Sequence, residues 1–266
     1  MHSHNSFGRR VVETKLSVVL LVALVASAGL SGRTSVEPGA SVTEPLAAAP
    51  PAAPLAGELP GDTTDAPAMP SSFDATAWEG ASLGAIDPGV FATALRAAAA
   101  AVSRGDATEP ATLTVIDFSK PSTEKRMWVF DLRARTLLFE ELVSHGRGSG
   151  KTMATSFSNV PESNRSSLGL FRTAETYVGK HGYSLRLDGL EPGVNDRARD
   201  RAIVMHAADY VNGAMAKANG YLGRSLGCPA VRPEISRQLI DAVKNGGLLF
   251  AYYPDQQWLE TSSYLN

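Results

Sequence analysis

The chain has 266 residues, of which 44% are hydrophobic and 20% are charged, with 25 basic and 27 acidic side chains. The apolar share is enough to fill a core, which excludes a long disordered chain. The nearly balanced charge argues against a nucleic-acid-binding protein, which usually has a basic excess. A single cysteine excludes an intramolecular disulfide and a thiolate-rich zinc site, and with only five histidines it leaves few candidates for catalysis.

Residues 1–30 are typical of a secretory signal peptide. Arg9, Arg10 and Lys15 precede an apolar run over 16–30, and Ala-Ser-Ala at 26–28 fits an A-x-A cleavage site. The run is shorter than the ~20 residues that a membrane-spanning helix needs, and an uncleaved anchor is the alternative. We therefore predict export to the periplasm or cell envelope, with no stable membrane insertion of the mature chain.

Residues 31–72 are predicted to form a linker. Eight of the 16 prolines lie between positions 36 and 70, among alanine, glycine, threonine and acidic residues. Such a composition favours an extended, semi-rigid segment over packed structure.

A helical extension is expected over 73–110. Asp87 and Pro88 are typical of a helix start, the alanine-rich segment 90–103 has apolar residues at helical spacing, and Gly105 suits a helix end. The sequence leaves open whether this extension packs onto the following domain or forms a separate arm.

The pattern after Pro110 predicts strands rich in β-branched and aromatic residues. They are expected over 113–118, 127–132, 137–143, 168–173, 183–187, 202–206 and 248–253. A second helix is expected over 233–244, ended by Gly246 and Gly247. Many strands with few helices indicate a mainly β domain of the barrel or sandwich kind over 111–256, followed by a C-terminal tail over 257–266.

Cys228 is the first candidate for catalysis. It lies in the glycine-rich turn Gly223-Arg-Ser-Leu-Gly-Cys-Pro-Ala230, where an exposed thiol fits better than a packing cysteine. Gly227 allows the backbone to approach a bound carbonyl closely, and nearby backbone N–H groups suit an oxyanion hole. His206 ends the predicted strand Ile203-Val-Met-His206 and is the natural base for the thiol. A buried core histidine and an inert cysteine are the alternatives.

Two further histidines, His145 and His181, also lie beside glycines. His145 begins His145-Gly-Arg-Gly-Ser-Gly150, in which Arg147 and backbone N–H groups suit an anionic ligand; an ordinary strand-to-loop turn is the alternative. The segment does not match a phosphate-binding loop.

Several ordered motifs together resemble the L,D-transpeptidase catalytic domains (YkuD-like), in the branch of murein L,D-transpeptidase catalytic domain proteins. The resemblance covers about 112–254. It rests on Val143-Ser-His-Gly-Arg-Gly-Ser-Gly150, Phe157-Ser-Asn159, Ser166-Ser-Leu-Gly169, Gly179-Lys-His-Gly182, Leu185-Arg-Leu-Asp-Gly-Leu190, His206 and the segment 223–230.

The resemblance implies a role for each matching residue. His206 takes the place of the upstream histidine, the general base, and Ser225, Gly227 and Cys228 take those of Ser/Thr, Gly and the nucleophile. Ser166 lies where members often carry a Thr-Pro-x-Gly-x-aromatic segment.

Two departures from the family pattern concern the site. Leu226 replaces the histidine of the Ser/Thr-His-Gly-Cys motif, so that histidine is either dispensable or replaced, with His181 and His145 as candidates. Pro229-Ala230 replaces the usual apolar-Arg/Asn pair, and Arg224 or Arg232 is the candidate substitute for that substrate contact. The predicted substrate-binding residues are therefore Arg224, His145, Arg147, Ser166 and His181.

The resemblance implies acyl transfer on peptidoglycan stem peptides without a cofactor or metal. Cys228 would form a thioester with loss of D-alanine, and an amine would then take the acyl group. Water as the acceptor would make the protein an L,D-carboxypeptidase. Three other classes stay open: another exported cysteine peptidase or amidase, a metallopeptidase using His145, His181, His206 and an aspartate, and a non-catalytic wall-binding module. The sequence predicts no oligomeric state.

Overall fold

The computed structural model describes residues 71–266, so the predicted signal peptide and all but the last two residues of the predicted linker lie outside the described residues. The helices are η1 (Ala75–Trp78), α1 (Pro88–Ser103), η2 (Arg147–Ser149), α2 (Gly213–Asn219), α3 (Pro233–Val243) and α4 (Gln256–Thr261). The strands are β1 (Thr112–Asp117), β2 (Met127–Asp131), β3 (Thr136–Glu141), β4 (Gly169–Gly179), β5 (Gly182–Gly189), β6 (Val204–Ala207), β7 (Ala230–Val231) and β8 (Leu248–Tyr252). Within 71–266, no helix is long and apolar enough to cross a membrane.

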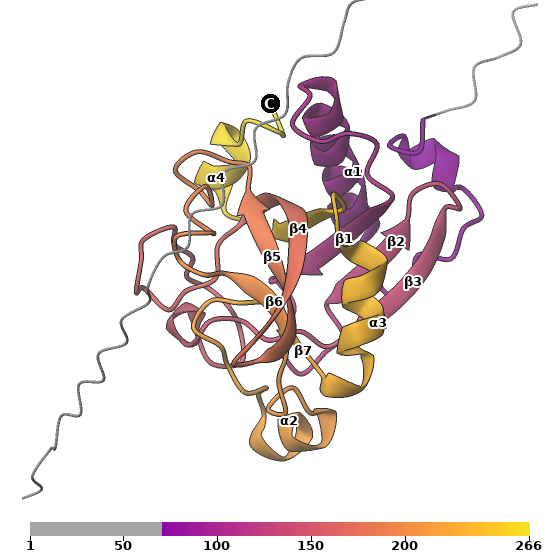
Figure 1. The fold of residues 1–266 in the computed structure, drawn as a ribbon. Coiled ribbons are helices and arrows are strands. Elements are labelled where there is room, and N and C mark those ends of the chain that lie inside the picture. Colours follow the sequence, from indigo (N-terminus) through magenta and orange to yellow (C-terminus); the bar gives the residue numbers. More distant parts are fainter. Residues whose placement is uncertain (1–70) are drawn as a thin grey trace, which may run out of the picture. The chain divides into compact units, whose positions relative to one another are not determined.

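The eight strands form one sheet in the order β3-β2-β1-β8-β4-β5-β6-β7 (Figure 1). Neighbouring strands are antiparallel except for the pairs β1–β8 and β6–β7, which are parallel. The predicted mainly β class is confirmed, and each predicted strand segment overlaps a strand of the sheet.

Contacts between the two edge strands nearly close the sheet into a barrel. Just after β3, the N–H of Ser144 donates to the carbonyl of Ala230 in β7 at 2.9 Å. Gly146 and Ser225 form a parallel bridge two residues further on. Arg232 adds a bidentate ion pair with Glu141 of β3, at 2.8 and 2.9 Å. The segment 225–230, which contains Cys228, therefore lies where the two edge strands of the barrel meet.

The predicted helix over 90–103 is confirmed as α1, and it packs into the same core as the sheet. The Asp87 carboxylate caps it by accepting from the N–H groups of Gly89 and Val90. Its buried face contacts β1 and β8, and the Phe91 ring lies 4.6 Å from that of Phe130 in β2. Of the two arrangements left open by the sequence, the structure therefore has the helix packed onto the β domain.

The C-terminal residues are also part of the fold. In α4, Trp258 is buried and donates from its indole N–H to the carboxylate of Glu191, a buried side chain that also accepts from Ser262. Tyr264 is buried as well and donates to Asp106 at 2.9 Å. The predicted tail therefore covers part of the core with its own side chains.

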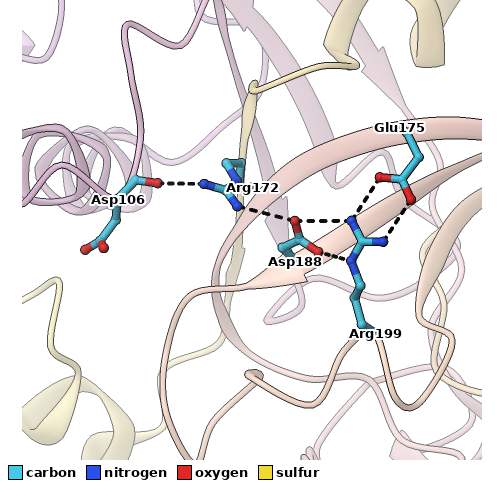
Figure 2. A network of polar contacts seen from close by, with 5 residues as sticks. All are labelled: Asp106, Arg172, Glu175, Asp188 and Arg199. Atoms are coloured by element: carbon cyan, nitrogen blue, oxygen red, sulfur yellow. Dashed lines mark hydrogen bonds and ion pairs between the residues drawn. The ribbon is translucent and has the colours of Figure 1, made fainter.

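A surface network fixes the loop 190–203 onto the β4–β5 hairpin (Figure 2). Arg199 in the loop donates to Asp188 of β5, and it forms a bidentate pair with Glu175 of β4 at 2.8 and 2.9 Å. Asp188 also pairs with Arg172 across the two strands. The guanidinium of Arg199 lowers the pKa of the Glu175 carboxyl to about 2. Because this loop leads directly into β6, the network fixes the segment that precedes His206 in the chain.

Candidate active site

Pairing between β6 and β7 brings the two catalytic candidates together. The register of the parallel pair sets His206 opposite Ala230, which follows Cys228 by two residues. His206 and Cys228 line one pocket of about 390 Å³. Cys228 and His206 therefore come to this pocket from two segments, 22 residues apart, that meet at the edge of the sheet.

The turn that holds Cys228 is fixed by side-chain hydroxyls. Ser225 Oγ donates to the carbonyl of Cys228 at 2.7 Å and accepts from the N–H of Gly227 at 3.1 Å. Ser166 Oγ donates to the carbonyl of Gly227 at 3.1 Å and accepts from the N–H of Gly146. Ser225 and Ser166 are both buried, so the structure gives them the role of shaping the turn.

Gly227 has a conformation that excludes a side chain. Its φ is +131°, and a Cβ atom would lie 2.8 Å from both the carbonyl oxygen of Arg165 and Cδ1 of Ile203. The N–H of Gly227 is already used by Ser225. In the part of the chain that the structure describes, no other residue accepts a hydrogen bond from the N–H of Cys228. Cys228 itself is therefore the better source of an oxyanion-hole donor in this turn.

Positive charge gathers around the pocket. Its lining includes three cationic side chains, those of Lys180, Arg201 and Arg224, together with His181 and His206. No carboxylate within residues 71–266 belongs to that lining. Such a pocket attracts anionic ligands, because the field of several cations adds up in a partly enclosed space.

The surroundings of Cys228 favour the protonated thiol. The half-buried Sγ donates towards the carbonyl of Ala202 at 3.6 Å and accepts from the N–H of Val204 at 3.5 Å. Burial raises the pKa of the Cys228 thiol above its ordinary value, although Arg201 and Lys180 act in the opposite direction.

His206 is held in one neutral form. It is 2% exposed, and its Nδ1 lies 2.8 Å from the carbonyl oxygen of Ala207. Because a carbonyl only accepts, Nδ1 bears the proton and Nε2 is the basic nitrogen. Burial, with added repulsion from His181 and Lys180, lowers the pKa of His206. The resting pair is therefore a neutral thiol and a neutral imidazole, with the imidazole ready to take a proton.

His145 lies outside the pocket, contrary to its predicted contact with substrate. It is fully buried: Nδ1 accepts from the Arg126 guanidinium at 2.7 Å, and Nε2 lies 3.3 Å from the carbonyl of Gly150. Burial, followed by the charge of Arg126, lowers the pKa of His145 to about 4. Because both ring nitrogens have protein partners, His145 supports the 143–150 segment, and neither nitrogen is free to bind a substrate or a metal ion.

The glycines that follow His145 allow backbones to pack closely. A Cβ atom on Gly146 would lie 2.4 Å from the carbonyl oxygen of Asn164, and one on Gly148 would lie 2.4 Å from that of Ser163. Arg147 is exposed and does not line the pocket. The strand-to-loop alternative therefore describes this segment better than an anion-binding one.

The remaining predicted residues divide between pocket and scaffold. Arg224 lines the pocket and donates to the carbonyl of Gly150 at 2.9 Å, whereas Arg232 is committed to Glu141. His181, at the tip of the β4–β5 hairpin, lines the pocket and stacks on His206. Leu226 lines the pocket with a 57% exposed side chain.

Several pocket residues were not predicted from the sequence, among them Lys180, Arg201 and Tyr210. Arg201 donates to the carbonyls of Ser158 and Arg165, so it ties two loops together behind Cys228. Tyr210 lines the pocket beside Gly223, whose missing side chain makes room for the tyrosine. Arg201 lies among several arginines with no pattern that marks it, and the tight Gly223–Tyr210 contact is visible only in three dimensions.

Comparison with known families gives one match. A family model described as the L,D-transpeptidase catalytic domain matches residues 83–252. No curated protein matches the chain.

Several solved structures are similar to the chain at low identity. They include an L,D-transpeptidase from Mycobacterium smegmatis, at 15% identity over 54% of this chain and 59% of that one, with a TM-score of 0.33. Another, from Stackebrandtia nassauensis, shows 13% identity over 62% and 66%, with a TM-score of 0.33. L,D-transpeptidase 3 from Mycobacterium tuberculosis, in complex with a faropenem-derived adduct, shows 14% identity over 54% and 61%, with a TM-score of 0.35. The chain spans about three fifths of the length of the first of these structures.

Proposed function

Since the chain belongs to the L,D-transpeptidase catalytic domain family, we propose that it is a cysteine-dependent acyltransferase that acts on peptidoglycan stem peptides. The observation that carries the proposal is the shared pocket of Cys228 and His206 within a cationic lining. A nucleophile and a base facing one cavity are the parts that acyl transfer needs.

The first half-reaction acylates Cys228. Nε2 of His206 takes the proton of the thiol as Sγ attacks the carbonyl of the third stem residue. The negative charge on that carbonyl oxygen is met by the N–H of Cys228. The amide C–N bond then breaks, His206 returns its proton to the leaving D-alanine amine, and a thioester remains on Cys228.

The second half-reaction removes the acyl group. An amine of a second stem loses a proton to His206 and attacks the thioester carbonyl. Sγ leaves as a thiolate, which is protonated by His206. If water takes the place of the amine, the same steps give an L,D-carboxypeptidase, so the identity of the acceptor decides between the two activities.

The cationic pocket suits the chemistry of the donor. Stem peptides carry free carboxylates, and Lys180, Arg201 and Arg224 line the pocket in which they would lie. In the family pattern an Arg or Asn follows shortly after the cysteine, and Ala230 replaces it here. Arg224 takes over that substrate contact, since Arg232 is paired with Glu141. We also propose that the protein acts in the cell envelope, because its substrate is there and residues 1–30 have the pattern of an export signal.

Intact-protein mass spectrometry tests this function. The reduced protein is mixed with a muropeptide bearing a tetrapeptide stem, with Cys228→Ala as the matched control. We expect an adduct equal to the stem minus D-alanine on the wild type alone. The muropeptide products then separate a new cross-link from a shortened stem.

Each negative outcome of this experiment points to a different function. A folded, reduced protein that gives neither adduct nor free D-alanine would contradict acyl transfer from this donor. Binding to peptidoglycan without turnover would favour a wall-binding module, and D-alanine release that survives Cys228→Ala but stops with a chelator would favour a metallopeptidase.

A further inference from the structure

His181 covers the ring of His206. The two imidazoles are stacked, with centroids 4.3 Å apart and an interplanar angle of 25°. His181 comes from the tight turn between β4 and β5, far from His206 in sequence. This turn includes Gly182 at a φ of +71°, with open space around the glycine.

The stack is unequal, because one ring is buried and the other is exposed. His206 is 2% exposed, whereas His181 is exposed and has no hydrogen bond from its ring to another side chain among residues 71–266. A histidine placed at a surface turn without a bonding partner does little for folding. Its ring instead supplies part of the cover that keeps water from His206.

We propose that His181 is a positioning residue for His206, holding it as the neutral Nδ1–H form that acts as the base. This inference rests on the proposed acyl transfer, in which Nε2 of His206 takes a proton. Two stacked imidazoles cannot both be charged at low cost, since like charges at this distance repel. The ring of His181 therefore favours a neutral His206 by excluding water, and any positive charge on His181 would oppose a second charge on His206.

Other charged and titratable groups also face His206 and set the background for this effect. Those in the pocket lining are Lys180 and Tyr177 from the hairpin, Arg201 from the preceding loop, Tyr210 after β6, and Arg224 and Cys228 from the cysteine turn. Lys180 and His181 both lower the pKa of His206, after burial as the larger cause. None of the others stacks on the ring, so His181→Ala removes a cover that no other side chain of this pocket provides.

Two substitutions separate the contribution of the ring from that of the charge. His181→Phe keeps a flat ring over His206 and cannot be protonated, whereas His181→Ala removes both features. Val178→Ala is the matched control, because Val178 is 80% exposed on the same hairpin and does not line the pocket.

The first readout is the NMR titration of the His206 ring in the full chain, which needs no activity. We expect the pKa of His206 to rise in His181→Phe, to rise further in His181→Ala, and to stay unchanged in Val178→Ala. Titration curves for His206 that coincide in all four proteins would overturn the proposal.

The second readout is the pH profile of acylation. A higher His206 pKa leaves less neutral base at low pH, so we expect His181→Ala to lose about tenfold in rate near pH 6 and much less near pH 8. His181→Phe should recover most of this loss. A loss that is equal at all pH values, with a thermal midpoint lowered in parallel, would mean that His181 serves only folding. If the wild type forms no acyl-enzyme, the proposed function fails, and the NMR titration still decides whether His181 controls His206.

Discussion

Ser225 and Cys228 are joined by a hydrogen bond from the serine hydroxyl to the cysteine carbonyl, 2.7 Å long, and the same hydroxyl accepts from Gly227. One buried side chain thus closes both ends of the turn that presents the thiol. The direction in which the Cys228 N–H points depends on this turn.

We expect Ser225→Ala to slow acylation on the order of 10- to 100-fold while costing only about 1–3 kcal/mol of stability, because it leaves two backbone groups of a buried turn without their partner. Single-turnover acylation followed by mass measures the effect. Ser225→Thr, which keeps the hydroxyl, should restore most of the rate. Ser156→Ala is the control, since the Ser156 hydroxyl has no hydrogen bond to the described residues. Acylation by Ser225→Ala at the wild-type rate would contradict this role.

Gly227 provides a second test of the turn. A methyl group there would meet a carbonyl oxygen at 2.8 Å in addition to an unfavourable φ of +131°. We expect Gly227→Ala to lower the free energy of unfolding by more than about 2 kcal/mol and to abolish acylation. Gly193 has a φ of +78° with nothing within 4 Å, so Gly193→Ala should cost only about 1 kcal/mol and leave acylation intact. If urea denaturation gave the same loss of unfolding free energy for Gly227→Ala and Gly193→Ala, close packing at Gly227 would be unimportant.

The sequence predicted the strands well because their signal is local. Runs such as 113–118 and 127–132 combine β-branched and aromatic residues, and nearly all of their residues are buried. The two-residue strand β7 and the helix α2 were missed. Ala230 and Val231 are too few for a pattern, and α2 is a helix of only seven residues, capped by Asn212.

The site was predictable where chemistry marks a residue and not where tertiary packing does. Cys228 and His206 stand out because a lone cysteine in a glycine-rich turn and a histidine at a strand end are unusual. The burial of His145 depends on Arg126, which lies 19 residues away and has no distinguishing pattern. The contact of His181 with His206 likewise requires the β4–β5 hairpin to fold over β6.

The C-terminal segment should be essential for stability. Trp258 is buried and shares the Glu191 carboxylate with Ser262, so its loss leaves both a cavity and a buried carboxylate with fewer partners. We expect Trp258→Ala to cost about 3–5 kcal/mol in chemical denaturation. Gln257→Ala, on the exposed face of the same helix, should change stability by less than about 0.5 kcal/mol. A small effect of Trp258→Ala would mean that the C-terminal segment contributes little to the stability of the fold.

Arg201 is expected to control the reactivity of Cys228. Its charge lowers the pKa of a thiol that burial raises, so removal of the charge should move the pKa further up. We expect Arg201→Gln to be alkylated by iodoacetamide more slowly at pH 8 than the wild type, with the midpoint of the pH profile at higher pH. Arg201→Lys keeps the charge but loses the fork of bonds to Ser158 and Arg165, so it should shift the midpoint less. A midpoint that is unchanged in Arg201→Gln would show that this cation does not reach the thiol.

His145 should make the stability of the protein depend on pH. Its pKa in the folded protein is about 4, against 6.5 for a free side chain, so the unfolded chain binds more protons between these values. Stability therefore falls as the pH drops from about 6.5 to about 4 and levels off below, by at most about 3 kcal/mol from this group.

Comparison with His145→Gln isolates this contribution. Glutamine keeps an acceptor for the Arg126 guanidinium but does not titrate, so other acidic and histidine groups contribute equally to both proteins and cancel in the difference. We expect the free energy of unfolding, from urea titrations at several pH values, to fall less steeply between pH 6.5 and 4 in His145→Gln. Parallel curves for the two proteins would mean that His145 has the same pKa in the folded and unfolded states. Its contact with the buried Arg126 guanidinium argues against that outcome.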